Sequence, residues 1–582
     1  MSAISITRRE ALSLAMSAAG AAGLVGAEGA HAAPVSGTMP AQLDRFIRAY
    51  LPAMNAPGLT LALTHARDTV HTAGYGYADL SAKTAVTAEH LFEIGSITKS
   101  FVAVMVLQLQ EEGKIDLHKP ILQYLPWLPM ETLYGEVLIH HLLTHTSGMP
   151  GDAPALPDSP GTRLQQAFKP GTRFHYSNWG YDVLGRLIER MDGRSWEAAL
   201  QRRILAPLGM TATAPLITSS LRARLVQSYV PLYDDRPYPR HGPLTPAGNL
   251  TVTTSAGCIA STPGDMARYM RMLLNRGAGP AARVLSEDSF KLFATPYIAA
   301  DEFGPGAAYG YGIAVDQLDG HKRLRHTGGM VSFMSALHLD LDAGFGAFAS
   351  INAQLGYRPN PVAQYALQLL RARQEHKSAP PAPAPDAGLV VDHPEQYAGI
   401  YTAADGRQLE VRAAKDRLLL RVDAKDVELQ QAPEPDQFIA DHARFALYPL
   451  VFGRASQSQA QLATDAKSVA PPVIELAYGA DSYAHPSHPQ TRPPAAAPEL
   501  NAYVGQYYSE NPWLGCVRVV QRRGQLWLGG STVLTPCGDR LFRVGPEPDA
   551  PDTLEFVNVI DGRAQGLSFA GGQFKLVPEE MA

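Results

Sequence analysis

The stretch Phe92–Phe101, FEIGSITKSF, places a serine and a lysine three residues apart at the start of an apolar run, FVAVMVLQLQ. Residues three apart on a helix share a face, so the Ser96 hydroxyl and the Lys99 amine can be hydrogen-bonding neighbours. A lysine surrounded by apolar residues loses its proton more readily than one in water, and a neutral amine is the base that a serine nucleophile needs. About two such pairs are expected by chance in a chain of this length, so the pair alone is a weak signal.

Two later segments carry groups that suit the same chemistry. In Pro170–Asn178, PGTRFHYSN, the phenol of Tyr176 can shuttle a proton while the carboxamide of Asn178 holds a substrate carbonyl or N–H group. In Arg325–Met330, RHTGGM, small residues precede a strand-like run, where a substrate backbone could pair with one N–H group aimed at an oxyanion. Taken alone, a half-buried tyrosine and a glycine turn between strands explain these segments better.

Together and in this order, the three segments resemble those of the penicillin-recognising serine hydrolases. That family includes class C β-lactamases, D-Ala-D-Ala carboxypeptidases, D-aminopeptidases and related esterases. The resemblance covers about residues 40–370 and implies an α/β (α+β) β-lactamase-like catalytic domain, with an antiparallel sheet flanked by helices. Three further stretches are similar to framework segments of the family: GKIDLHKPILQYLP at 113–126, LIHHLLTHTSGMP at 138–150 and TSAGCIASTPGDMARYM at 254–270.

The resemblance implies a role for each residue that matches a motif of the family. Ser96 would be acylated, Lys99 would take its proton, and Tyr176 would relay a proton to the leaving group. Asn178 would bind the amide of the substrate, and the N–H groups of Ser96 and Gly329 would form the oxyanion hole. No metal or cofactor is implied. The expected substrate-binding strand consists of His326, Thr327, Gly328 and Gly329.

One departure from the family pattern bears on the substrate. Many members with β-lactamase or carboxypeptidase activity have lysine where this chain has His326, and a neutral histidine is a poor partner for a substrate carboxylate. Members with His-x-Gly act as D-aminopeptidases, peptidases and esterases. We therefore expect a hydrolase that cleaves amide bonds of small peptides or D-amino-acid derivatives. An esterase or acyltransferase, a weak β-lactamase and a non-catalytic penicillin-binding or sensor protein stay open as alternatives.

The remainder of the chain contains two similar small units separated by Pro/Ala-rich linkers. Tyr397–Tyr401 and Tyr503–Tyr507 each open a run of short alternating segments, which is typical of antiparallel strands and of small barrels. The pair resembles the D-aminopeptidase arrangement, in which two lipocalin-like barrels follow the catalytic domain and can reach the mouth of its active site. The predicted divisions are 1–32 signal peptide, 35–373 catalytic domain, 374–392 linker, 393–483 first barrel, 484–498 linker and 499–582 second barrel.

Within the catalytic domain, the apolar patterns predict particular helices and strands. Helical periodicity covers residues 40–50, 97–112, 181–203 and 264–275, and strand-like runs cover Leu59–Thr64, Ala336–Asp340 and Gly346–Ile351.

The N-terminus predicts export to the periplasm or secretion. Arg8 and Arg9 precede an Ala/Gly/Leu stretch that ends in small residues, which resembles a twin-arginine signal. No later run of about 20 apolar residues indicates a membrane span. A net charge of -5 without a basic block argues against nucleic-acid binding, so the expected partner is a small-molecule or peptide substrate, and a homo-oligomer is left open.

The other reactive residues are expected to be structural. His140, His141 and His145 have metal-ligand spacing but match a framework segment of the family and lack the glutamate of a zinc-protease motif. Cys258 is expected to be a small buried side chain. Pairing of the two remaining cysteines, Cys516 and Cys537, is left open. The chain has no Gly-x-Ser-x-Gly, which argues against an α/β-hydrolase.

Overall fold

The computed structural model describes eight stretches of the chain. They are residues 41–152, 164–248, 250–356, 358–385, 389–432, 434–455, 471–488 and 497–578. The predicted signal peptide, residues 1–32, lies outside them, as do residues 386–388 of the first predicted linker and 489–496 of the second. None of the helices in these stretches has the length and apolar character needed to cross a bilayer.

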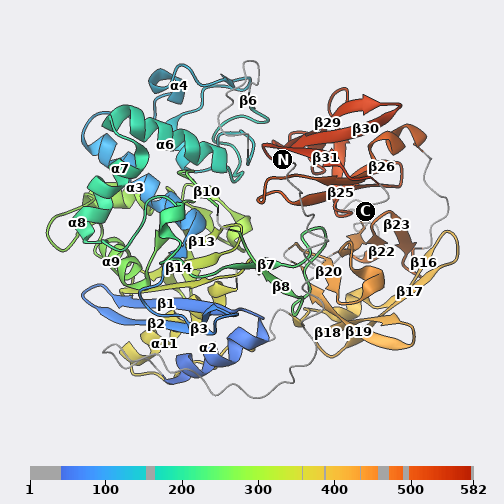
Figure 1. Cartoon of the computed structure of the whole chain (residues 1–582), viewed down its shortest axis with the longest axis horizontal. Helices are drawn as coiled ribbons and strands as arrows, with labels where there is room; N and C mark the ends of the chain where they lie inside the picture. Colours follow the sequence, from blue (N-terminus) through green and yellow to red (C-terminus); the bar gives the residue numbers. More distant parts are fainter. Residues whose placement is uncertain are drawn as a thin grey trace, which may run out of the picture. The chain divides into compact units, whose positions relative to one another are not determined.

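A nine-stranded sheet forms the centre of the first domain (Figure 1). The paired strands are antiparallel, and β1 lies beside β15, so the two ends of the domain sequence meet in mid-sheet. In order across the sheet, the strands are β10 (Ile298–Ala299), β11 (Ala308–Tyr309), β12 (Ala314–Leu318), β13 (His321–Gly329), β14 (Met334–Asp340), β15 (Phe345–Ile351), β1 (Gly58–His65), β2 (Thr69–Asp79) and β3 (Thr84–Ala85).

Helices cover both faces of this sheet, and this explains why its central strands are apolar throughout. Leu59, Leu61 and Leu63 of β1 pack with α2 and α11, whereas Ala62 faces the core that contains α3, α6 and α9. Strands buried on both faces read as continuous apolar runs because each side chain meets a packed layer. The helices are α2 (Ala41–Ala53), α3 (Thr98–Glu111), α4 (Ile121–Tyr124), α5 (Ile139–Leu143), α6 (Asn178–Asp192), α7 (Trp196–Leu200), α8 (Ala206–Leu208), α9 (Pro263–Leu274), α10 (Glu287–Phe293) and α11 (Pro359–Gln374).

The prediction of one helix over residues 181–203 is wrong. Helix α6 ends at Asp192 because Gly193 adopts the left-handed conformation, with φ of 73°. The chain then re-enters a helix at Trp196. The other predicted helices and strands are confirmed, with bounds shifted by a few residues. Short strand pairs complete the domain: β4 (Phe92–Glu93) with β9 (Ala260–Ser261), β5 (Met130–Glu131) with β6 (Leu164–Gln165), and β7 (Tyr229–Pro231) with β8 (Leu244–Pro246).

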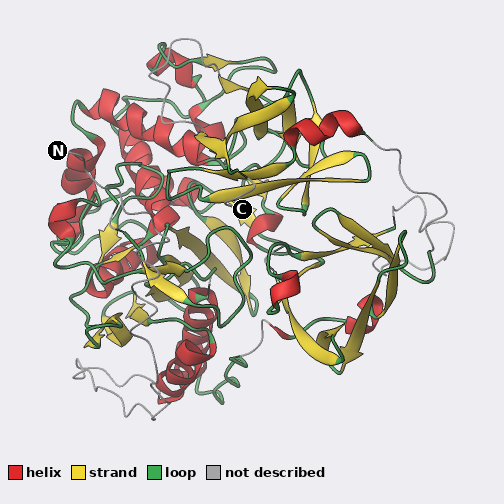
Figure 2. Ribbon diagram, turned by 45° about the vertical axis from the view of Figure 1, so that its right-hand side comes forward, coloured by secondary structure: helices red, strands yellow, loops and turns green. Residues whose placement is uncertain are grey.

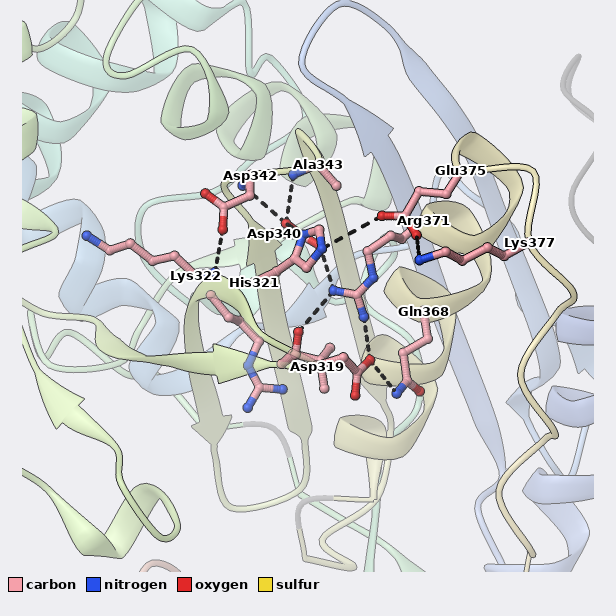
Figure 3. Close-up of polar contacts among 12 residues, drawn as sticks. Asp319, His321, Lys322, Asp340, Asp342, Ala343, Gln368, Arg371, Glu375 and Lys377 are labelled. Carbon is pink, nitrogen blue, oxygen red and sulfur yellow. Dashed lines mark hydrogen bonds and ion pairs between the residues drawn. The ribbon is translucent and has the colours of Figure 1, made fainter.

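A buried arginine ties α11 to the turns of the sheet (Figure 3). Arg371 is 6% exposed, and its guanidinium binds Asp319 after β12 and Asp340 at the end of β14, the latter at 3.2 Å. It also donates to the carbonyl of Leu318 at 3.0 Å. A buried charge of this kind is tolerated because several acceptors surround it. The network therefore fixes the helix against one end of the sheet.

The C-terminal part of the chain folds into two closed eight-stranded barrels, and Figure 2 shows that they consist mostly of strands. The first comprises β16 (Gly399–Ala403), β17 (Gln408–Ala414), β18 (Arg417–Val422), β19 (Lys425–Gln431), β20 (Gln437–Ala440), β21 (Leu450–Arg454), β22 (Val473–Tyr478) and β23 (Asp481–Ala484). The second comprises β24 (Gly505–Tyr508), β25 (Cys516–Arg522), β26 (Gln525–Leu528), β27 (Thr532–Pro536), β28 (Leu541–Val544), β29 (Thr553–Ile560), β30 (Arg563–Phe569) and β31 (Gly572–Leu576).

The predicted likeness of the two barrels extends to a hydrogen bond. The hydroxyl of Tyr401 donates to the carbonyl of Tyr397 at 2.8 Å, and the hydroxyl of Tyr507 donates to that of Tyr503 at 2.9 Å. Apolar side chains fill the barrel interiors, and Leu526 is among them. The predicted architecture, a helix-flanked antiparallel sheet followed by two all-β barrels, is confirmed.

The three cysteines carry free thiols. Cys258 is fully buried in the core of the catalytic domain, which confirms the prediction that it is a small buried side chain. Burial raises the pKa of its thiol, so the thiolate is disfavoured. Cys516 and Cys537 belong to the second barrel and are not paired.

Candidate active site

Glycines allow the turn that contains Ser96 to pack closely against the end of β13. Gly95 has φ of 54°, and a Cβ atom there would lie 2.7 Å from the backbone nitrogen of Gly329. A Cβ atom on Gly328 would lie 1.9 Å from the carbonyl oxygen of Ile94. Side chains at these positions would separate the two backbones. The small residues of β13 therefore serve first to let Ser96 approach the strand.

The amine of Lys99 lies at the centre of the site. Lys99 is fully buried at the start of α3, and its Nζ lies 3.0 Å from Ser96 Oγ, 2.6 Å from Asn178 Oδ1 and 2.9 Å from the carbonyl oxygen of Ala256. Burial lowers the pKa of Lys99 from 10.5 to about 7, although the carboxylates of Asp182 and Asp152 act in the opposite direction.

These contacts leave the lysine able to act as a base toward Ser96. A neutral amine has two N–H groups and one lone pair, and the oxygens of Asn178 and Ala256 can only accept hydrogen bonds. When both accept from Lys99, the lone pair is left for the hydroxyl of Ser96. Ser96 itself is half-buried, so its oxygen is open to a substrate.

Asn178 and Tyr176 flank the lysine at the start of α6. Ser177 caps this helix, because its hydroxyl accepts from the N–H of Gly180 at 3.1 Å. The amide of Asn178 donates from Nδ2 to Asp152 at 2.9 Å, so its oxygen faces Lys99. The amine of Lys99 lies 4.8 Å from the ring centroid of Tyr176. The predicted group of Ser96, Lys99, Tyr176 and Asn178 thus converges on one point.

His326 is built into the wall of the site. It is 1% exposed, its Nδ1 lies 2.5 Å from the carbonyl oxygen of Thr327, and its Nε2 lies 2.8 Å from the hydroxyl of Tyr309. Because a carbonyl only accepts, Nδ1 carries the proton and Nε2 accepts from the tyrosine. Burial, followed by the charge of Lys99, lowers the pKa of His326 to about 3. The ring is therefore neutral, and the half-buried Thr327 and Gly329 are the more open members of the predicted strand segment.

The histidines of the framework segment make different contacts. His145 is buried beneath Tyr176, with ring centroids 4.2 Å apart, and its Nδ1 accepts from the N–H of Ser177 at 3.0 Å. His140 contacts the hydroxyl of Tyr311 instead, at 2.8 Å. No cluster of His, Cys, Asp or Glu suited to a metal occurs in the stretches that the structure describes.

The second barrel contributes to the mouth of the site, as the resemblance implied it could, but the residues that do so were not predicted from the sequence. Asp552 accepts from the N–H of Gly151 at 2.8 Å and lies 3.4 Å from Nε2 of His175. Gly151 is next to Asp152 and accepts from the backbone N–H of Asn178 at 2.8 Å.

A second contact holds the loop between β28 and β29 of the second barrel, which contains both Asp549 and Asp552. Arg173 binds Asp549 through the carboxylate at 3.1 Å and through the carbonyl at 2.9 Å. Glu302 lies close enough to His175 and Asp552 to interact with both electrostatically. We call these residues the rim of the site: Asp152, Arg173, His175, Glu302, Asp549 and Asp552.

Comparison with known proteins gives a consistent result. A profile of the Beta-lactamase family matches residues 43–372, more than half of the chain. Penicillin-binding protein 4 of Amycolatopsis lactamdurans is 29% identical over 301 residues, which make up 48% of this chain and 77% of that protein. Protein flp of Staphylococcus aureus is 29% identical over 253 residues, which make up 40% of this chain and 49% of flp. The solved structure of an octameric penicillin-binding protein homologue from Pyrococcus abyssi is 23% identical, with a TM-score of 0.52, and covers 76% of this chain and 99% of its own, a likeness of fold.

Proposed function

The chain belongs to the Beta-lactamase family of serine hydrolases, and on that premise we propose that it cleaves amide bonds of small peptides or D-amino-acid derivatives through an acyl-enzyme on Ser96. The observation that carries this proposal is the buried amine of Lys99, 3.0 Å from Ser96 Oγ and held on its other sides by two carbonyl oxygens. A serine beside such a base has the arrangement of an activated nucleophile.

In acylation, Ser96 Oγ attacks the carbonyl carbon of the substrate while its proton passes to Lys99 Nζ. The backbone N–H groups of Ser96 and Gly329 stabilise the negative charge on the carbonyl oxygen. The C–N bond then breaks, and the departing nitrogen receives the proton of the Lys99 ammonium through the hydroxyl of Tyr176. The products of this half-reaction are the free amine and an ester of Ser96.

In deacylation, water attacks the carbon of that ester and passes its proton along the same route in reverse. The bond to Ser96 Oγ breaks and the serine regains a proton, which restores a neutral Lys99. The balance over both steps is one amide and one water consumed, with one carboxylic acid and one amine formed.

The charges of the rim support a substrate with a free amino group. Four carboxylates, one guanidinium and one histidine surround the mouth of the site. An acidic rim attracts an ammonium group and repels a carboxylate. His326 is neutral, so the wall of the site offers no fixed positive charge to a substrate carboxylate. These features favour an aminopeptidase over a carboxypeptidase or a penicillin-hydrolysing enzyme.

A panel of chromogenic substrates tests this proposal. D-alanine p-nitroanilide should be hydrolysed with the highest kcat/KM, and N-acetylation of its amino group should lower that value at least tenfold. L-alanine p-nitroanilide, p-nitrophenyl acetate and nitrocefin complete the panel, with Ser96→Ala as control. A preference for p-nitrophenyl acetate over all amides would favour an esterase, and a preference for nitrocefin would favour a β-lactamase.

We also propose that the protein is exported, on the evidence of Arg8, Arg9 and the Ala-rich stretch that follows. Replacement of both arginines by lysine should retain the full-length chain in the cytoplasm, whereas the original sequence should yield a shorter mature chain outside it. Equal distribution of the two forms after cell fractionation would contradict twin-arginine export.

A further inference from the structure

A carboxylate on α6 holds the chain segment that contacts the catalytic lysine. Asp182 lies one turn after Asn178, and its Oδ1 accepts from the hydroxyl of Thr254 at 2.5 Å and from that of Ser255 at 3.3 Å. The hydroxyl of Thr254 in turn accepts from the N–H of Ala256 at 3.1 Å. Asp182 is thus the anchor of the segment Thr254–Ala256.

The segment Thr254–Ala256 packs closely against α6. A Cβ atom on Gly185, the residue one turn after Asp182, would lie 2.1 Å from the hydroxyl of Ser255. The single proton of the Ser255 hydroxyl is shared between Asp182 and the carbonyl of Tyr181, which lies nearer, at 3.0 Å. The segment therefore lies directly on α6, and its last carbonyl, that of Ala256, accepts from Lys99 Nζ at 2.9 Å.

We propose that Asp182 is a positioning residue for Lys99: it holds the segment Thr254–Ala256, and with it the carbonyl that accepts from the lysine, and it places a carboxylate near the amine. This inference rests on the proposed function, in which Lys99 takes the proton of Ser96. Asp182 does not touch the reacting atoms. It acts through the segment Thr254–Ala256 and through its electric field.

The charged and titratable groups that face Lys99 support an effect of this sign. The carboxylates of Asp182 on α6 and of Asp152 before it favour the ammonium form. His145 and His326 are buried and neutral, and Tyr176 and Tyr181 present their rings. Burial raises the pKa of Asp182 itself, but the hydroxyl of Thr254 and the charge of Lys99 favour its ionised form. Of its other neighbours, the thiol of Cys258 is kept protonated by burial.

Two variants separate the two roles of Asp182. Asp182→Asn keeps an oxygen that can accept from Thr254 but removes the charge. Thr254→Val keeps the charge and removes the hydroxyl that links Asp182 to Ala256. Asp192→Asn is the matched control, because Asp192 lies on the same helix and pairs with Arg203 at 2.5 Å, away from Lys99.

The measurement is the second-order rate constant for phosphonylation of Ser96 by a fluorophosphonate, followed by intact mass between pH 5 and 9. In this reaction the serine oxygen displaces fluoride at phosphorus and its proton passes to Lys99. Asp182→Asn should shift the acidic midpoint of the profile to lower pH by about one unit, as expected on loss of a neighbouring opposite charge. Thr254→Val should lower the plateau about tenfold and should shift the midpoint less than Asp182→Asn does, because it removes one hydrogen bond to the carboxylate and not the carboxylate itself.

Each outcome bears on the proposal. Asp192→Asn should leave the midpoint unchanged. An Asp182→Asn profile lowered by one factor at every pH, with no shift of the midpoint, would show a merely structural role and overturn the inference. Thermal melting distinguishes loss of folding from loss of rate, and a folded Asp182→Asn with the wild-type midpoint also overturns it. If Ser96 of the wild-type protein is not phosphonylated at any pH, the proposed function fails, and the inference falls with it.

Discussion

The floor and the rim of the site differ in almost every physical respect. We define the floor as Ser96, Lys99, Asn178 and His326, which come from the catalytic domain and surround a buried amine. The rim is half-exposed and charged, and two of its members, Asp549 and Asp552, belong to the second barrel. Burial changes the pKa of a lysine by several units, whereas exposed charges are screened by water. We therefore propose that the floor performs the chemistry and that the rim selects the substrate.

The largest expected effect comes from the floor. Lys99→Met should lower the rate of hydrolysis about 10³-fold, as is typical when a general base is removed. A chromogenic substrate turned over by the wild-type protein provides the measurement. A variant that kept a tenth of the wild-type rate would remove Lys99 from the mechanism.

The same variant should be more stable than the wild-type protein at neutral pH. The pKa of Lys99 is about 7 in the folded protein and 10.5 in water, so the unfolded chain binds more protons between these values. Folding stability contributed by Lys99 therefore rises with pH across this window. The melting temperature of Lys99→Met should exceed that of the wild-type protein at pH 7, and the difference should shrink toward pH 10. A constant difference would contradict a buried, uncharged lysine.

The rim should give a smaller and more selective effect. Asp552→Asn should lower kcat/KM about fivefold for substrates with a free amino group, which corresponds to an interaction of roughly 1 kcal/mol. Substrates without that group should be affected less than twofold. Gln430→Ala is the matched control, because this residue of the first barrel accepts from the backbone of Arg240 in the catalytic domain at 2.7 Å. An equal loss on both kinds of substrate would refute a selective rim.

The sequence predicted much of the floor, because its residues lie in short local motifs. The resemblance to the penicillin-recognising serine hydrolases is confirmed by the family profile and by the fold. Ser96 and Lys99 share one helical turn, so their spacing alone brings them together. Tyr176 lies two residues before Asn178, the first residue of α6, so both belong to one short motif. The close approach of Gly328 to Ile94 results from tertiary packing, which the sequence does not reveal. The sequence shows only a glycine, whose lack of a side chain allows the approach.

The resemblance implied that a barrel can reach the mouth of the site, but the individual rim residues could not be predicted, because no local pattern joins them. Asp552 directly precedes β29 and has the appearance of an ordinary loop aspartate, and its partner Gly151 lies in another domain. Asp182 could have been identified from the sequence. It lies four residues after Asn178 on the same helical face, and a carboxylate among the apolar neighbours of that face is a signal that spacing could have found.

The smallest expected effect concerns a carboxyl group beside the floor. Glu93 is 8% exposed, and burial raises its pKa from 4.5 to about 8. In the unfolded chain this group ionises above 4.5, so its contribution to stability is present at low pH and is lost as the pH rises to about 8. Glu93→Gln should melt above the wild-type protein at pH 8, with no such advantage at pH 5. If Glu93→Gln instead melted below the wild-type protein at pH 8, Glu93 would be an ionised carboxylate with a stabilising partner.

The pH dependence of covalent labelling tests the central claim most directly. The wild-type protein, treated with a fluorophosphonate, should gain one phosphonyl group that Ser96→Ala does not gain. Its labelling rate should rise about tenfold per unit up to a midpoint near pH 7, where Lys99 becomes neutral, and then level off. An adduct on another residue, or a rate without a midpoint between pH 6 and 8, would contradict the assignment of Ser96 and Lys99 as nucleophile and base.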